Sequence, residues 1–127
     1  MPRPQPGDAI TLAPRITPTH STAGLPGFPA VDVFGRPGAL VVADFFGKVT
    51  RISGRRCSLG GVPGGAYGRS VYVKNAVTGV VRYVTHLDAL AVSVGDLIAP
   101  GTVLGTLCDS AVSGKPGTTH AHYGIGR

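Results

Sequence analysis

Two histidines separated by one residue, His120 and His122, lie near the C-terminal end of this chain and make up half of its four histidines. In a β-strand, residues i and i+2 project from the same face, so these two imidazoles would lie roughly 7 Å apart on one side of a sheet. At that spacing they can serve one reacting centre in different roles. One can bind a metal ion while the other contacts the metal-bound water or the substrate. Taken alone, the pair fits two solvated surface histidines better than a reacting centre.

The acidic residues limit which catalytic and metal-binding groups this chain can provide. The chain has no Glu, so its carboxylates are all aspartates: Asp8, Asp32, Asp44, Asp88, Asp96 and Asp109. This excludes a His-Glu-x-x-His zinc helix and a glutamate glycosidase pair, and any general base must be His or Asp. Asp32 lies within an apolar, strand-like segment, where a buried carboxylate needs a partner. A metal ion would supply that partner, whereas an edge strand with Asp32 facing water would need none.

The elements that position these residues are predicted to be β-strands. The 127 residues suffice for one domain, and 20 Gly and 11 Pro among many Val and Ile residues favour many tight turns and no long helix. We predict an all-β fold, a compact antiparallel sheet or β-sandwich spanning residues 31–127, preceded by an extended arm at 1–30 with a turn near 24–27. Strands are expected at 31–34, 39–43, 48–53, 70–74, 80–86, 102–107 and 119–125, with a hairpin turn at 75–79 and a loop at 55–68.

Charge and cysteine content bear on the partners. The net charge is +6, but the basic residues are scattered and lack the interleaved aromatics of nucleic-acid modules, so we expect no nucleic acid as partner. Such a surface suits other polyanions, including bacterial wall polymers. No apolar stretch reaches membrane length, and the N-terminal residues lack the apolar core of a signal peptide. For Cys57 and Cys108, a disulfide and two separate thiols both stay open, and we favour the thiols.

Four segments, in this order along the chain, resemble the lysostaphin-type zinc endopeptidases, which cut the peptide cross-links of peptidoglycan. Residues 30–38, AVDVFGRPG, are similar to the strand and turn that carry the family's aspartate ligand, and residues 83–87, YVTHL, to a segment with an active-site histidine. Residues 92–105, VSVGDLIAPGTVLG, match a stretch with two glycine turns, and the His-Ala-His at 120–122 resembles the closing His-x-His. The resemblance spans residues 26–126.

The resemblance implies a lysostaphin-type β fold, similar to a barrel-sandwich hybrid, and a Zn²⁺ cofactor. Asp32 and His122 would be zinc ligands in a nitrogen and oxygen shell with an open position. Zinc would make hydroxide available near neutral pH, and His86 and His120 would act beside it as base, acid or hydrogen-bond donors. We also expect Tyr83 and Tyr123, which neighbour these histidines in sequence, to contact the substrate, a peptide of peptidoglycan.

One position departs from the family pattern. The first zinc ligand is a His four residues before the Asp, and this chain has Phe28 there, which cannot bind zinc. In one interpretation His20, twelve residues before Asp32, replaces it after the chain folds back through glycines and prolines. In the other, only two ligands remain and the domain is a binding or structural module without hydrolysis.

A chain with no recognisable secretion signal and no separate wall-targeting module fits a phage-encoded wall hydrolase carried on a virion tail. We therefore expect it on a virion among tail proteins, or at the bacterial cell wall after release. A catalytically impaired virion module that contacts the wall is the main alternative. The glycine turns also suggest a lipoyl or biotinyl carrier, but Lys48 lacks the neighbours that such a carrier's modified lysine needs.

Overall fold

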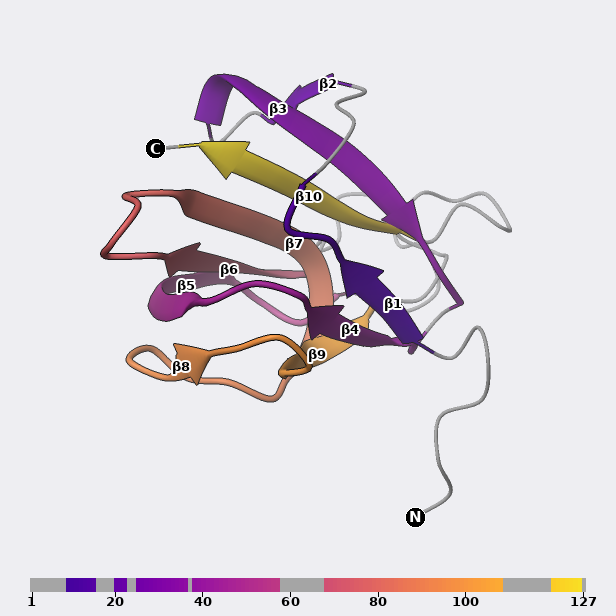
Figure 1. Ribbon diagram of the computed structural model, residues 1–127. Coiled ribbons are helices and arrows are strands. Elements are labelled where there is room, and N and C mark those ends of the chain that lie inside the picture. Colours follow the sequence, from indigo (N-terminus) through magenta and orange to yellow (C-terminus); the bar gives the residue numbers. More distant parts are fainter. Residues whose placement is uncertain are drawn as a thin grey trace.

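The protein folds as one branched sheet without a helix in the residues that the computed structural model describes, which are 9–15, 20–22, 25–36, 38–57, 68–108 and 120–126 (Figure 1). Ten strands form the sheet: β1 (Ala9–Leu12), β2 (His20–Thr22), β3 (Leu25–Phe34), β4 (Leu40–Ala43), β5 (Gly47–Gly54), β6 (Arg69–Lys74), β7 (Val81–Leu90), β8 (Leu97–Ile98), β9 (Val103–Leu107) and β10 (His120–Gly126). Among these residues no helix could span a membrane.

Neighbouring strands follow the order β1-β4-β9-β7-β10-β3-β2, with β6 on β7, β5 on β6 and β8 on β5. Every pairing is antiparallel except that of β1 with β4, which is parallel. In Figure 1 the yellow β10 runs between β3 and β7. This arrangement places the His-x-His strand next to the strand that carries Asp32.

β7 connects the two halves of the sheet by changing partners along its length. Val81 to Thr85 pair with β10, whereas Leu87 and Leu90 pair with β9. The change occurs at His86, which has a left-handed backbone with φ of 71°. The sheet thereby folds over on itself at His86, and the core lies between the two halves.

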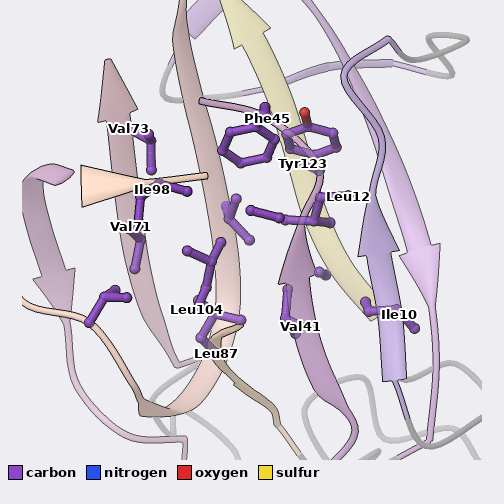
Figure 2. Packing of buried hydrophobic residues seen from close by; sticks show 14 of the residues in the cluster. Ile10, Leu12, Val41, Phe45, Val71, Val73, Leu87, Ile98, Leu104 and Tyr123 are labelled. Carbon is purple, nitrogen blue, oxygen red and sulfur yellow. The ribbon is translucent and has the colours of Figure 1, made fainter. Parts of the chain in front are cut away.

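The core is built from alternate residues of almost every strand (Figure 2). Its largest fully buried side chains are Tyr123, Leu12, Leu87, Leu104, Leu107, Val41, Val49, Val71, Val73 and Val84. Each buried Val or Leu contributes roughly 1.5–3 kcal/mol of transfer free energy. Because strand side chains alternate between faces, the same strands present their polar residues on the opposite face of the sheet.

The all-β prediction is confirmed, and the predicted strands from residue 31 onward match β3 to β7, β9 and β10 to within a few residues. The hairpin at 75–79 is present, with the side chain of Asn75 accepting hydrogen bonds from the amides of Val77 (2.9 Å) and Thr78 (3.2 Å). The sheet is mixed, because β1 pairs in parallel with β4 while all its other pairings are antiparallel. Within the first thirty residues, 9–12, 20–22 and 25–30 are strands of this sheet. Most of the predicted loop at 55–68 lies outside the described residues.

Candidate active site

Asp32 and the two C-terminal histidines converge because β3 and β10 are paired in the register that aligns them. His122 is the partner of Asp32 and His120 is the partner of Phe34, so all three polar side chains share one face. The Oδ1 atom of Asp32 lies 3.1 Å from Nδ1 of His122 and 3.7 Å from Nε2 of His120. The side chains are 32%, 16% and 21% exposed respectively, so they are partly shielded and still reachable from solvent. One carboxylate oxygen therefore faces two imidazoles.

His86 joins this group from β7. Its ring lies edge-on to that of His120, with centroids 5.1 Å apart and an angle of 83° between the planes. It is the one non-glycine residue with positive φ among the described residues. A left-handed conformation is unfavourable for a residue with a Cβ, and such strained residues cluster at functional sites. The bend in β7 thus places a third histidine beside the His-x-His pair.

Polar and aromatic residues of β6 and β7 lie next to His122 on the same face. Thr85 is the register partner of His122, and its hydroxyl accepts a 2.8 Å hydrogen bond from Ser70, a largely buried residue. The ring of Tyr83 contacts that of His122 edge-on at 6.2 Å between centroids, and Ser70 also lies 3.5 Å from the Tyr83 hydroxyl. Tyr83 therefore lies where a substrate contact was expected. Ser70 and Thr85 were not identified as site residues from the sequence. Thr85 could have been found, because residues two apart in a strand project from the same face and Thr85 follows Tyr83 by two.

Tyr123 does not line the site, and its assignment as a substrate contact is wrong. It alternates with His122 along β10, so its side chain points to the opposite face and is fully buried. Its ring stacks on Phe45, its hydroxyl donates to the carbonyl of Ala13 at 2.7 Å, and Arg82 donates to that hydroxyl at 2.6 Å. Burial raises the pKa of Tyr123, with Arg82 acting in the opposite direction. Tyr123 is a core residue.

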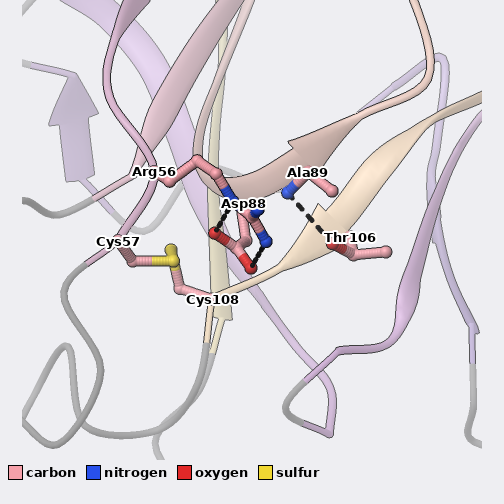
Figure 3. Close-up of polar contacts among 6 residues, drawn as sticks. All are labelled: Arg56, Cys57, Asp88, Ala89, Thr106 and Cys108. Carbon is pink, nitrogen blue, oxygen red and sulfur yellow. Dashed lines mark hydrogen bonds and ion pairs between the residues drawn. A yellow bond between two sulfur atoms is a disulfide. The ribbon is translucent and has the colours of Figure 1, made fainter.

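A disulfide joins Cys57 to Cys108 (Figure 3), so the expectation of two separate thiols is wrong. Their Cα atoms are 5.9 Å apart. The backbone amide of Cys108 donates a 3.0 Å hydrogen bond to the carbonyl of His86. Gly68 packs against this corner with φ of 94°, and a Cβ there would approach Cys108 Sγ to 2.6 Å. The disulfide thus links two cysteines that are 51 positions apart in sequence, and one of them is hydrogen-bonded to the backbone of His86.

An exposed ion pair lies next to the disulfide. Arg56 donates two hydrogen bonds to the carboxylate of Asp88, one from Nε at 3.0 Å and one from an Nη atom at 3.1 Å (Figure 3). The Arg56 hydrogen bond is the main reason that the pKa of Asp88 is lowered, and it raises the pKa of Arg56. Next to it, the hydroxyl of Thr106 accepts a hydrogen bond from the amide of Ala89. These contacts hold the segment leading to Cys57 against β7.

The position of His20 follows from backbone pairing. β2 pairs with β3 so that His20 is the partner of Ala30, which lies two residues before Asp32. Phe28 also belongs to β3. The side chains of His20 and Phe28 lie outside the described residues.

The pair of Asp32 and His122 meets a geometric requirement for zinc. Two ligand atoms bound at about 2.0–2.1 Å in a tetrahedral shell lie roughly 3.3 Å from each other. The distance of 3.1 Å between Asp32 Oδ1 and His122 Nδ1 is close to that value. In the described part of the chain no group of three or more His, Cys, Asp or Glu side chains is arranged to hold a metal. Two of the expected ligands therefore lie close enough to share an ion, at a distance that is also that of a hydrogen bond between them.

Neither a protein-family model nor a curated protein sequence matches the chain. Solved structures that resemble it include lysostaphin (TM-score 0.54, 23% identity, 76% of this chain), the deep-sea M23 metalloprotease pseudoalterin (0.56, 21%, 87%), and a mutant catalytic domain of the prophage-encoded M23 protein EnpA from Enterococcus faecalis (0.59, 18%, 95%). The chain spans 35%, 61% and 87% of those chains, respectively. It therefore has the all-β fold of the lysostaphin-type, or M23, peptidases.

Proposed function

We propose that the protein is a zinc-dependent endopeptidase that hydrolyses the peptide cross-links of bacterial peptidoglycan. The observation that supports this best is the convergence of Asp32, His122, His120 and His86, from three strands, on one partly exposed face. Three clustered imidazoles with a carboxylate are groups that can share proton transfer at one reacting centre. The fold likeness to the M23 metalloprotease pseudoalterin, to the M23 protein EnpA and to lysostaphin supports the reaction class.

In this proposal Asp32 and His122 hold the zinc ion, and His20 is the third protein ligand. Bound zinc lowers the pKa of a water molecule toward neutrality and polarises a carbonyl group. His120 and His86, whose rings contact each other, bind the attacked amide on the open side of the site. A neutral imidazole accepts the proton of the attacking water, and an imidazolium donates to the leaving amine. Thr85 and Ser70 fix the polar surroundings of His122.

The test is zinc content together with cleavage of purified peptidoglycan. We expect about one zinc per wild-type chain, loss of zinc in His122→Ala and Asp32→Asn, and retained zinc with cleavage reduced at least a hundredfold in His120→Ala. Arg15→Gln, an exposed change outside the site, serves as the control. Full cleavage by metal-free protein, or equal cleavage by wild type and His122→Ala, would contradict the proposal.

The third ligand is tested by a pair of variants. We expect His20→Ala to lose zinc, and Phe28→His in that background to recover it, because this change restores a His four residues before Asp32. Zinc binding that is unchanged in His20→Ala would rule out His20 as a ligand.

A catalytically impaired wall-binding module is the second candidate, favoured by the lack of a three-ligand group among the described side chains. It predicts binding to peptidoglycan without zinc and without cleavage. In either case we propose a phage setting, with the protein on a virion tail among other tail proteins or acting at the cell wall. The prophage origin of the EnpA structure supports that setting. Detection of the protein in purified virions tests it.

A further inference from the structure

A continuous row of side chains leads away from the histidines across the sheet. The ring of Tyr83 on β7 contacts His122 at 6.2 Å and Tyr72 on β6 at 4.9 Å, between ring centroids. The guanidinium carbon of Arg51 on β5 lies 5.2 Å from the centre of the Tyr72 ring. The row therefore crosses four strands, from β10 to β5, without a break.

The strand register puts the whole row on the face that carries the histidines. Arg51 pairs with Tyr72, Tyr72 with Tyr83, and Tyr83 with Gly124, which neighbours His122 by two residues along β10. The residues that flank Tyr72 in β6, Val71 and Val73, point into the core. The row is thus a surface feature that begins at the reacting centre.

Arg51 is exposed at the far end of the row and has no carboxylate partner among the described residues. Its guanidinium lies over the face of the Tyr72 ring, a favourable cation–π position. The two tyrosines are half-buried, so each presents part of its ring as apolar surface. Burial is the main cause of a raised pKa at Tyr72. The arrangement combines an apolar floor with one cationic end.

We propose that this row is a substrate subsite in which Arg51 binds a free carboxylate of the peptide and Tyr72 and Tyr83 support the backbone between that carboxylate and the scissile bond. The inference rests on the proposed peptidase function and specifies its substrate. Three steps between adjacent strands span about 14 Å, which corresponds to about four residues of extended peptide. The preferred substrate is therefore a peptide with a carboxylate side chain or free α-carboxylate about four residues from the bond that is cut.

The chemistry favours a carboxylate over a neutral amide. Arginine offers two parallel N–H donors that match a carboxylate in a bidentate pair, and lysine offers only a point charge. A charge-assisted contact at a partly exposed position predicts roughly three- to tenfold discrimination between acid and amide.

Binding is measured by NMR titration in a His120→Ala background, so that cleavage does not interfere and the contacts of His122 with Tyr83 are kept. The probes are end-blocked octaglycine peptides carrying one Glu, and the same peptides with Gln. We expect the Glu peptides to bind three- to tenfold more tightly and to shift the Nε–H resonance of Arg51. Arg51→Gln removes the preference, Arg51→Lys retains only part of it, and the charge-matched control Arg15→Gln leaves it intact.

Equal affinity for Glu and Gln peptides, or a preference that survives Arg51→Gln, would overturn the subsite. In the parent protein, cleavage products of the Glu peptides locate the carboxylate relative to the cut, and we expect a separation of about four residues. The NMR titration measures binding without cleavage, so the two proposals can fail separately. If the protein prefers Glu peptides through Arg51 but cuts no peptide, the endopeptidase proposal is contradicted and the carboxylate subsite is supported.

Discussion

The backbone amide of Cys108 donates a 3.0 Å hydrogen bond to the carbonyl oxygen of His86. The end of β9, cross-linked to Cys57, therefore lies directly against the residue at which β7 bends. The ring of His86 in turn contacts that of His120, so the position of the His86 backbone affects the placement of both rings. The disulfide is thus part of what positions a histidine.

Removing the disulfide is expected to lower both stability and cleavage. A cross-link that closes a loop of 51 residues restricts the unfolded chain by about 4 kcal/mol in the loop-entropy treatment. We expect Cys57→Ser with Cys108→Ser to lower the free energy of unfolding by about 2–4 kcal/mol and to reduce cleavage even at temperatures where the protein is folded. Denaturant unfolding and turnover at low temperature measure the two effects. A phosphine reductant is expected to reproduce them in wild type and to leave the double variant unchanged.

Substitutions at His86 distinguish the effect of its left-handed backbone on stability from the effect of its imidazole on cleavage. Because φ is 71°, glycine is tolerated there and alanine is strained, so His86→Gly is expected to be more stable than His86→Ala by about 1 kcal/mol. In an ordinary strand position this order is reversed. Both variants are expected to lose cleavage activity while retaining zinc. If the alanine variant were the more stable of the two, the left-handed backbone at position 86 would be wrong.

Tyr123→Phe tests the assignment of this tyrosine to the core. The change leaves the carbonyl of Ala13 and the guanidinium of Arg82 without their shared partner, at a cost of about 1–3 kcal/mol at neutral pH. Since the folded pKa of Tyr123 is raised above 10.0, folding favours the neutral phenol, and this stabilisation is present below pH 10 and lost as the pH rises through the folded pKa. Urea unfolding as a function of pH should show the wild type and variant converging in alkaline solution. Tyr83→Phe, on the other face, is the control and should change stability little.

Asp88→Asn tests the ion pair with Arg56. Because the pKa of Asp88 is lowered below 3.8 in the folded protein, the pair stabilises the fold above that pH and ceases to do so as the pH falls through the lower folded value. We expect a lower Tm for the variant at pH 7 and equal Tm values once the pH is well below the folded pKa of Asp88. The difference at pH 7 should also shrink in high salt, because the pair is exposed. A difference between the two proteins that does not decrease as the pH is lowered from 7 into the acid range would point to a cause other than the ion pair.

Much of the candidate site could be predicted from local sequence. Alternation along a strand puts His120 and His122 on one face whatever the strand's neighbours are, and the absence of Glu leaves His and Asp as the ionisable groups for proton transfer. The hairpin at Asn75 is likewise encoded in a few adjacent residues. These features depend on covalent geometry and residue type, which the sequence states directly.

Tertiary structure decided the features that depend on which strands become neighbours. The pairing of β3 with β10 brings Asp32 within 3.1 Å of His122 across 90 residues of sequence. Alternation separates Tyr123 from its neighbour His122, but only the packing of β1 and Phe45 over that face makes it core rather than surface. The sequence also left the Cys57–Cys108 pairing and the parallel β1–β4 contact open, because both depend on chain closure over long separations. Residue types and their alternation thus determined which chemistry was available, and the strand register determined where it assembled.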